Sequence, residues 1–574
     1  MLTRRGGPAR GIGSALWNSP LQMQMQLSIA EAPEPGASSG QTSPKTYTGI
    51  YAMHKYWSKK PFNLVSEYID KFSKPGDTVL DCFSGSGVTL IEAIRLRRRA
   101  IGIDINPAAV FMTDAALRSV NIRQLRARFN EIKRTCAELV NSLYRTTCAT
   151  CNSDNALATH LIWKNGLPVE VWFSCTDCKT KKGIKGPDAT DRERAARPML
   201  EPRWYPSDLL HTNTRINVKE GTRVSDLFAP RALVALSIIF ERIKLVEADD
   251  ERAILMSCFT ATLPQASKMV FVIRRRGKAT GSKDESKAEV GSWVIGFWVP
   301  KEHFEINAWR CFENRFTRTM RGKVEMQQLI ERKILTGAAP NSVLYGNADY
   351  SVSIGNAAQL PLPDESIDYA FIDPPHGNRI PYLELSMIWN SWLAQDADWG
   401  NEIIVSEAPG RKKNVADYNV RMEHVFRELA RVLRPTACLS VVFNSLDDET
   451  WVSFVGAIRA AGFDIAELTP LAYSANSVVQ DNRENALKTD FVMSCVRTVV
   501  DAKRNPLPII NETARIDAAI TAALAAHSGL AETYEILNYV LVDCIPKGNL
   551  ITPTSVIAIL SRNCTIENGR WRHK

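Results

Sequence analysis

The sequence predicts a doubly wound α/β core, because three short apolar segments run into a conspicuous polar residue or turn. Residues 78–80 precede a glycine-rich turn and a helix, residues 100–103 run into Asp104, and residues 366–372 run into Asp373. In open α/β sheets, ligands bind outside the carboxyl ends of the strands. We therefore expect these segments to be core strands that carry ligand-binding residues at their ends.

Length and composition indicate a multi-domain globular protein. A chain of 574 residues exceeds one ordinary core, so we expect insertions and smaller modules around a large domain. The hydrophobic fraction is 45%, yet no apolar run approaches the roughly 20 residues of a membrane span, so no membrane partner is expected. The net charge of +9 favours polyanionic partners without deciding between them. The twelve cysteines are mostly scattered singly, which is typical of a reducing cytoplasm.

Five segments are expected along the chain. Residues 1–45 are rich in Gln and Met and then in Pro, Gly and Ser, which predicts a disordered lead-in. The others are the first half of the core at 46–115, an insertion at 116–340, the second half of the core at 341–500 and a helical module at 501–574.

The turn DCFSGSG (81–87) lies between a strand and a helix that begins near Val88. Its glycines let the backbone approach a ligand, and the helix start offers unpaired N–H groups. No Gly-Lys-Ser/Thr follows and the G-x-G-x-x-G pattern is incomplete, so neither a Walker loop nor a dinucleotide fingerprint is predicted. Asp104 follows Asp81 by 23 residues, where a Rossmann-like fold places the carboxylate that binds ribose hydroxyls.

D-x-F-x-G-S-G resembles the motif by which amino-methyltransferases of DNA hold S-adenosylmethionine. This resemblance implies a Rossmann-like methyltransferase core and S-adenosylmethionine as cofactor, with Asp104 on its ribose. It also implies that the methionine end of the cofactor lies against Asp81, Phe83, Gly85, Ser86 and Gly87.

Two further segments resemble cofactor-contacting parts of the same family. MHKYWSKKP (53–61), followed by an expected amphipathic helix at 62–72, implies contacts from His54, Tyr56 and Trp57, with a generic basic-aromatic loop as the alternative. Gly355-Asn356-Ala357 stands where related enzymes carry a turn beside the adenine ring, which implies a contact from Asn356.

The tetrad Asp373-Pro374-Pro375-His376 supplies residue types that amine methylation needs. The amine of adenine is a poor nucleophile because its lone pair is delocalised, and two acceptors for its N–H bonds would localise that pair. Asp373 offers a carboxylate and Pro374 a carbonyl, while the prolines keep the loop extended. By resemblance, the fourth residue stacks on a base swung out of the duplex, and aspartate at 373 favours adenine N6 over cytosine N4.

His376 departs from the Tyr, Phe or Trp that the family usually carries at the fourth position. The predicted function is site-specific methylation of DNA, at adenine N6, in the cytoplasm and associated with the nucleoid. Two alternatives stay open: methylation of RNA at guanine N2 or adenine, and an inactive zinc-ribbon protein that binds DNA. No Pro-Cys pair occurs, so cytosine C5 chemistry is not predicted.

The insertion carries two C-x2-C pairs that predict a zinc ribbon at 146–180. Cys148 and Cys151 are separated by 23 residues from Cys175 and Cys178, and four thiolates leave no open coordination position, so the ion is expected to be structural. A twin redox centre is the alternative. A cysteine-rich insert, together with segments 377–393 and 406–435, resembles a group of bacterial adenine-specific DNA methylases.

The rest of the insertion is expected to house target recognition. By resemblance Arg231 faces the substrate, and residues 274–287 predict a mobile loop with a phosphate contact as the functional hypothesis. Trp293, Trp298 and Trp309 are expected in the core rather than stacked on bases.

The C-terminal residues predict helices and a short closing segment. A winged-helix-like module and a helical cap on the core are equally compatible with the pattern. A restriction or defence partner and the oligomeric state stay open.

Overall fold

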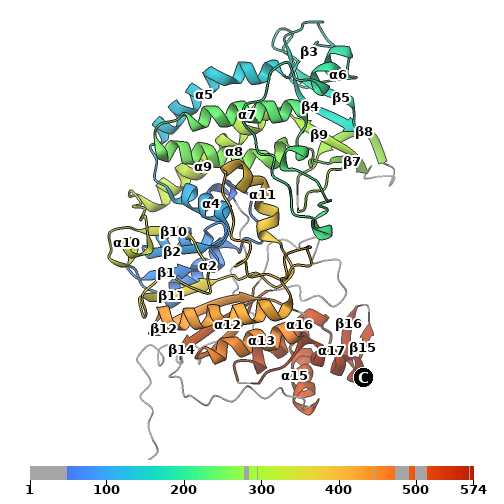
Figure 1. Ribbon diagram of the computed structural model, residues 1–574. Coiled ribbons are helices and arrows are strands. Elements are labelled where there is room, and N and C mark those ends of the chain that lie inside the picture. The colour runs from blue at the N-terminus through green and yellow to red at the C-terminus, as the bar shows by residue number, and fades with distance from the viewer. Residues whose placement is uncertain are drawn as a thin grey trace, which may run out of the picture.

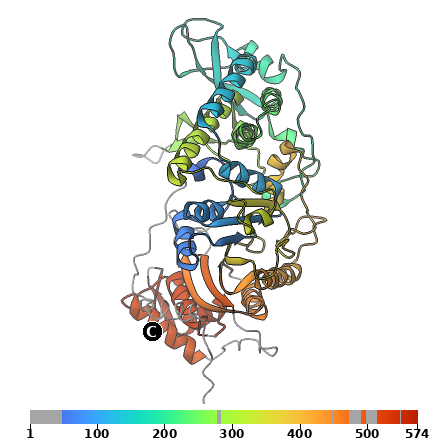
Figure 2. The same cartoon turned by 90° about the vertical axis from the view of Figure 1, so that its left-hand side faces the viewer.

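A computed structural model describes residues 48–276, 283–293, 295–445, 448–471, 490–497, 513–547, 549–567 and 569–574. The expected disordered lead-in at 1–45 lies outside these residues. The core forms the middle of the molecule, with the insertion at one end and the C-terminal module at the other (Figures 1 and 2).

The core is a seven-stranded sheet in which only β14 runs antiparallel to its neighbours. Its spatial order is β10 (Tyr350–Ile354), β2 (Arg99–Asp104), β1 (Thr78–Asp81), β11 (Ile367–Ile372), β12 (Leu433–Phe443), β14 (Asp490–Arg497) and β13 (Phe463–Leu471). Numbered along the chain, this order is 3-2-1-4-5-7-6, which reverses beside the first strand as in doubly wound folds. The predicted Rossmann-like core is confirmed.

Helices cover both faces of the sheet because its central strands are apolar on both sides. All four residues of β1 are buried: Val79 packs into the cluster that includes residues of α2 and α3, and Leu80 into the cluster that includes residues of α12 and α13. The core helices and the first short turn are η1 (Gly49–Ala52), α2 (Phe62–Phe72), α3 (Val88–Arg95), α4 (Pro107–Leu117), α10 (Pro340–Leu344), α11 (Tyr382–Leu393), α12 (Val415–Val432) and α13 (Asp448–Ala460).

The insertion leaves the core after α4 and returns before α10, between strands β2 and β10. It combines packed helices with a sheet of order β3-β4-β5-β6, in which β9 also pairs with β4. Its elements are α5 (Ile122–Ser142), β3 (Arg145–Thr146), β4 (Ala156–Lys164), β5 (Leu167–Ser174), β6 (Gly183–Lys185), α6 (Ala189–Ala196), η2 (Thr214–Ile216), η3 (Val224–Leu227), α7 (Pro230–Lys244), α8 (Asp249–Ala266), β7 (Val272–Arg276), β8 (Lys283–Val290), β9 (Glu302–Ile306) and α9 (Ala308–Ile330).

The sequence predicted a loop over residues 274–287, and this prediction is wrong for part of the tract. Its two ends belong to the paired strands β7 and β8, and only residues 277–282 lie outside the described part of the chain. The two strands form through backbone hydrogen bonds despite their polar side chains. Their sequence lacks the apolar alternation from which a strand would be predicted.

The C-terminal module contains three helices and a hairpin. These are α15 (Thr513–Ala526), α16 (Thr533–Cys544), α17 (Pro553–Asn563), β15 (Cys564–Glu567) and β16 (Arg570–His573). Helix α16 contacts β13, and the apolar side chains of the module belong to one cluster with those of the core. The module is therefore packed onto the edge of the sheet. Among the described helices, none combines the length and apolar character needed to cross a membrane.

Candidate active site

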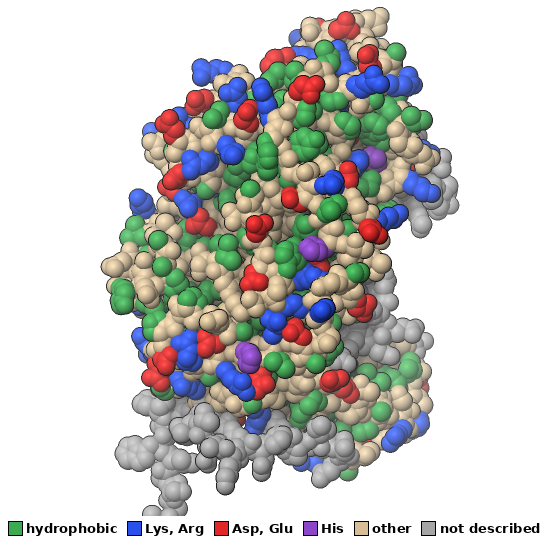
Figure 3. Space-filling model, in the orientation of Figure 1, with side chains coloured by type: hydrophobic (Ala, Val, Ile, Leu, Met, Phe, Trp, Pro, Cys, Tyr) green, Lys and Arg blue, Asp and Glu red, His purple; other side chains and the backbone are tan. Residues whose placement is uncertain are grey.

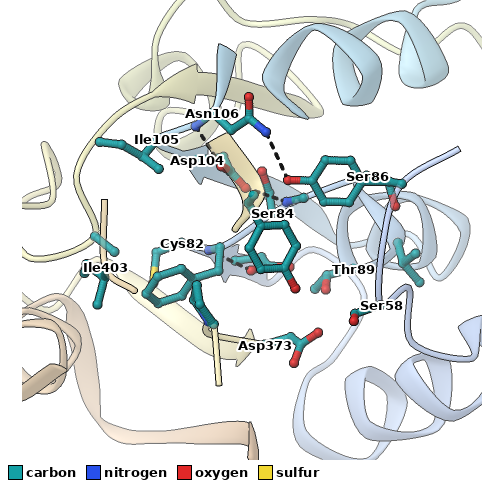
Figure 4. Close-up of a pocket in the computed structure, with 18 of the residues that line it drawn as sticks. Ser58, Cys82, Ser84, Ser86, Thr89, Asp104, Ile105, Asn106, Asp373 and Ile403 are labelled. Carbon is teal, nitrogen blue, oxygen red and sulfur yellow. Dashed lines mark hydrogen bonds between the residues drawn. The ribbon is translucent and has the colours of Figure 1, made fainter. Parts of the chain in front are cut away.

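A pocket of about 880 Å³, partly open to solvent, lies at the carboxyl ends of the parallel strands. Its wall includes residues that follow β1, β2, β10 and β11, which are four adjacent strands. Figure 4 shows Asp104 and Asp373 on different sides of this pocket. Of the sequence-predicted site residues, it brings together Tyr56, Trp57, Asp81, Phe83, Gly85, Ser86, Asp104, Asn356, Asp373 and Pro375.

Two glycines shape the loop between β1 and α3. Gly85 and Gly87 have φ of +50° and +76°, a region that side chains with a Cβ rarely adopt. At Gly87 an added Cβ would lie 2.5 Å from a side-chain carbon of Thr113. The glycines therefore permit both the turn and the close packing of the loop on α4. Gly87 does not line the pocket itself.

Asp104 is held by the backbone of two elements. Its Oδ2 accepts a hydrogen bond of 2.7 Å from the N–H of Gly85, and its Oδ1 one of 2.9 Å from the N–H of Asn106. Burial nevertheless raises the pKa of Asp104 to about 6, since these two bonds only partly offset the loss of water. The carboxylate thus fixes the glycine loop and also lines the pocket.

Asp81 is more buried than Asp104, and hydrogen bonds from Thr89 and Phe83 only partly support its charge. Its Oδ1 accepts a hydrogen bond of 3.0 Å from the N–H of Phe83. Burial raises its pKa to about 7, and the negative charges of Asp373 and Asp104 act in the same direction. A cationic ligand group would relieve this cost.

Of the ring-bearing residues in the N-terminal segment, Tyr56 and Trp57 line the pocket, whereas His54 does not. Tyr56 packs on Gly85, and its hydroxyl accepts a hydrogen bond of 3.2 Å from Asn106. Trp57 is buried and lines the same pocket. His54 does not line it: its ring contacts Thr260 and Trp389, and burial lowers its pKa to about 3. A neutral, enclosed imidazole fits a packing role.

The turn after β10 places Asn356 at the pocket wall. Its side-chain oxygen accepts a hydrogen bond of 2.9 Å from the N–H of Ala358, which fixes the turn. The opposite wall is formed by residues 401–403, from the segment after α11. Arg411 anchors that segment, because its guanidinium pairs with the buried carboxylates of Glu384, at 3.3 Å, and Glu402.

The tetrad at 373–376 begins directly after β11, where the Asp373 carboxylate lies beside a lysine. The Nζ of Lys60 lies 3.3 Å from Oδ1 of Asp373 and 2.7 Å from Oδ2 of Asp490, and its side chain is only 7% exposed. Nε2 of His376 lies 3.5 Å from the same Oδ1. Both contacts reach one oxygen of Asp373. Within the described part of the chain, no hydrogen bond to Oδ2 is found.

The two prolines differ in what their carbonyls do. The carbonyl of Pro375 accepts a hydrogen bond of 2.7 Å from the hydroxyl of Tyr418 and another from the N–H of Gly377. Among the described residues, none donates a hydrogen bond to the carbonyl of Pro374. That carbonyl and Oδ2 of Asp373 are thus two uncommitted acceptors on one loop.

The ring of His376 is largely enclosed. Its side chain is 8% exposed, packs edge-on against Phe443 and lies 3.3 Å from the carbonyl of Val442. It does not line the pocket that holds Asp373.

Sequence reasoning missed Lys60, Tyr382 and Glu402, which all line the pocket. Lys60 stands in the basic segment at 53–61, and its proximity to Asp373 depends on the packing of residues 313 positions apart. Tyr382 follows the tetrad within the segment that resembles the methylases. Its ring stacks against Tyr56 at 5.9 Å, a contact that no local pattern reveals.

The four paired cysteines converge in the insertion. The sulfur atoms of Cys148, Cys151, Cys175 and Cys178 all lie within 4.8 Å of one another. Sγ of Cys148 is 3.6 Å from that of Cys178, and Sγ of Cys151 is 3.8 Å from that of Cys175. All four are free thiols, so the cluster is not a pair of disulfides. The two strands expected beside it are present as β4 and β5.

The expectation that Arg231 faces the substrate is wrong. Its side chain is buried, with Nε 2.6 Å from Oε1 of Glu305 and the guanidinium 4.6 Å from the ring centre of Tyr144. Glu305 neutralises this charge inside the insertion, and the ion pair links α7 to β9. Trp293 and Trp309 are buried as expected, whereas Trp298 is 53% exposed.

Comparisons with known proteins match the cofactor half of the core. The family model for DNA methylases of the N6/N4 type matches residues 25–113. The chain is 30% identical over 77 residues to the type II methyltransferase M.MjaII of Methanocaldococcus jannaschii, and 43% identical over 63 residues to the type II methyltransferase M1.MboII of Moraxella bovis. These matches cover 13% and 11% of this chain, and 14% and 24% of the two relatives.

Among solved structures, an S-adenosylmethionine-dependent methyltransferase from Methanosarcina mazei is similar at 13% identity. The match covers 27% of this chain and 69% of that chain, with a TM-score of 0.15. The fold assignment rests on the strand order and not on this neighbour. The family match shows similarity to DNA methylases of the N6/N4 type over residues 25–113.

The raised pKa of Asp81 predicts a pH-dependent gain in stability for Asp81→Asn. Because the pKa in the folded protein, about 7, exceeds the ordinary 3.8, ionisation of Asp81 destabilises the ligand-free fold as pH rises from about 4 to above 7. Asparagine keeps the acceptor for Phe83 without the charge. We expect the melting temperature of the variant relative to wild type to be about 1–3 °C higher at pH 8 than at pH 5.

The control is Asp364→Asn, whose carboxylate is 73% exposed. A difference in melting temperature that is the same at both pH values for Asp81→Asn would contradict the assignment of the cost to its buried charge.

Proposed function

We propose that this protein is an S-adenosylmethionine-dependent DNA methyltransferase that modifies adenine at N6. The observation that carries the proposal is the meeting of Asp81, Asp104 and Asp373 in one pocket, at the ends of three strands that lie side by side. The order of these residues along the chain, together with the family match over residues 25–113, supports a cofactor half and a catalytic half.

The pocket suits the chemical groups of S-adenosylmethionine. Asp104 can accept from ribose hydroxyls, and the Asp81 carboxylate can face an ammonium group. Phe83, Ile105 and Ile403 add apolar wall for a ring. The hydroxyl oxygen of Ser84 is buried at this wall and has no hydrogen-bond partner among the described residues, so a polar ligand could satisfy it.

We infer that two acceptors on the loop after β11 activate an amine. Bound S-adenosylmethionine supplies a methyl group on a positively charged sulfur. Oδ2 of Asp373 and the carbonyl of Pro374 can each accept one N–H of an exocyclic amine, which localises the nitrogen lone pair and orients it for attack. As the amine is methylated it loses a proton, and Asp373 is the acidic group within the tetrad that can receive it.

Lys60 and His376 orient the carboxylate in this proposal. Both approach Oδ1 of Asp373, so the side chain turns its other oxygen away from them. Because the His376 ring already packs on Phe443, we assign it to this positioning role rather than to stacking on an extruded base.

DNA is proposed as the substrate on the strength of the family and of the two relatives, which are both named as type II methyltransferases. The net charge of +9 is compatible with a polyanion. On the face that Figure 3 shows, positively and negatively charged side chains are interspersed. No patch of one sign on this face therefore marks where a nucleic acid would bind.

A structural Zn²⁺ is proposed for the cysteine cluster. With Zn–S distances of about 2.3 Å, tetrahedral geometry places the sulfur atoms roughly 3.8 Å apart. The two shortest sulfur distances quoted above, 3.6 and 3.8 Å, agree with it. The ion would hold the loops of the β3–β6 sheet together, far along the chain from the catalytic tetrad.

Asp373→Ala tests the catalytic assignment. We expect methyl transfer to DNA to fall by about 10²–10³-fold or more, because the acceptor of the amine N–H is lost, while cofactor binding measured by calorimetry stays close to that of wild type. Asp364→Ala is the matched control on an exposed carboxylate.

The assay uses tritiated S-adenosylmethionine with DNA and RNA substrates, followed by nucleoside analysis of the product. Retained activity in Asp373→Ala would contradict the proposed mechanism. Label found in N4-methylcytosine or in RNA alone would overturn the adenine or the DNA part of the proposal.

Lys60→Met tests whether the lysine orients Asp373. We expect kcat to fall about 10-fold or more, with partial rescue by Lys60→Arg.

The control is Lys71→Met on α2, whose Nζ pairs with Glu467 at 2.8 Å on the surface. If kcat of Lys60→Met equals that of wild type, Lys60 does not orient the carboxylate.

Cys151→Ser tests the metal centre. Wild type should contain one zinc per chain by mass spectrometry of the metal, and Cys151→Ser should lose most of it and become sensitive to proteolysis within the insertion. Cys136→Ser, on α5 outside the cluster, should keep the zinc. Wild type that binds no zinc after expression in zinc-supplemented medium would refute the site.

A further inference from the structure

The C-terminal module has the order of elements of a winged helix. Helix α15 is followed by an isolated bridge residue, two helices and a hairpin. Ala531 pairs with Trp571 of β16 through hydrogen bonds of 3.2 and 2.8 Å, so the residue between the first two helices extends the hairpin into a small third strand. This arrangement places α17 as the third helix, directly before the wing formed by β15 and β16.

Helix α17 buries one face and exposes a polar one. Val556, Ile559 and Leu560 are buried in the core of the module. The exposed residues Thr554, Ala558, Ser561 and Arg562 recur at helical spacing on the other side. Three of these side chains are small, so the backbone of the helix can approach a groove closely, and Thr, Ser and Arg can contact base edges or phosphates.

The wing adds exposed arginines on one face of the hairpin. Residues alternate along β16, so Arg570 and Arg572 project opposite Trp571, which is buried. Arg572 lies 3.5 Å from Glu567, and both side chains are more than half exposed, so this surface ion pair is weak and can exchange for a phosphate.

Positive charge is concentrated at this end of the module. Residues 561–574 include Arg562, Arg570, Arg572 and Lys574 against one acidic residue, Glu567. The backbone N–H of Lys574 donates to the carbonyl of Asn563 at 3.1 Å, which brings the chain end beside the end of α17. The helix end and the wing therefore form one basic edge.

We propose that α17 and the β15–β16 wing form a second binding surface for duplex DNA, distinct from the methyl-transfer pocket. The polar face of α17 enters the major groove and the arginines of the wing contact the phosphate backbone beside it. Because α16 packs on β13 of the catalytic sheet, this contact holds the duplex in a fixed relation to the core. The inference rests on the proposed function only for DNA as the partner.

The experiment compares the double variant Arg570→Ala/Arg572→Ala with wild type in the full-length protein. Binding to a labelled 40-base-pair duplex is measured by fluorescence anisotropy over a range of salt concentrations. We expect the affinity to fall roughly 10-fold and the slope of log K against log[salt] to decrease by about 2, since two phosphate contacts are lost. A second variant, Ser561→Glu, places negative charge on the exposed face of α17 and should weaken binding similarly.

The matched control is Arg515→Ala/Lys547→Ala, which removes two positive charges from exposed positions elsewhere in the same module. Circular dichroism melting checks that each variant stays folded. Supporting results are weaker duplex binding by the wing variant and by Ser561→Glu, with a raised KM for DNA and unchanged kcat.

Three outcomes would overturn the proposal. These are an equal loss in the control pair, a loss of affinity for single-stranded RNA but not for the duplex, and a change of oligomeric state by sedimentation with unchanged DNA affinity. If wild type methylates no DNA yet binds the duplex through the wing, the proposed function fails while this surface stands.

Discussion

The pairing of β1 with both of its neighbours is the constraint on which the site depends. β1 has only four residues, all buried, and their N–H and C=O groups need partners on both sides. Leu80 is in register with Ile101 of β2 and with Ala370 of β11. This parallel register brings Asp81, Asp104 and Asp373 together at the carboxyl ends of the strands. The glycine loop, the loop after β11 and residues 401–403 lie around these strand ends.

Where a local pattern specified the structure, the sequence was sufficient to predict it. The helix at 62–72 has the expected bounds, because its apolar spacing is helical and Pro61 precedes it. The carboxylates at the strand ends follow from short apolar runs that stop at a polar residue. The β4–β5 hairpin follows from two apolar strands around Gly166, whose φ is +81°. Each of these signals spans only a few residues.

What the sequence did not predict depends on contacts between distant segments. Lys60 meets Asp373 only because the N-terminal segment crosses the end of β11. Arg231 was expected at the substrate by resemblance to the methylases, and its actual partner, Glu305, comes 74 residues later in the chain. Neither Glu402 nor Arg411 has a local motif, yet their pairing shapes the pocket wall. The polar strands β7 and β8 lack the apolar alternation by which strands are recognised.

The bridge from Lys60 to Asp490 has a consequence for how the protein matures. The two residues are separated by 430 positions in the chain, so ribosomes must translate most of the message before the carboxylate at the catalytic loop acquires its full set of neighbours. N-terminal segments emerge and begin to fold first during synthesis, whereas contacts between distant residues close late. A nascent or truncated chain that ends before β14 would thus display a folded glycine loop beside an unfinished catalytic loop. The full set of neighbours of Asp373 is in this way confined to chains that extend through β14.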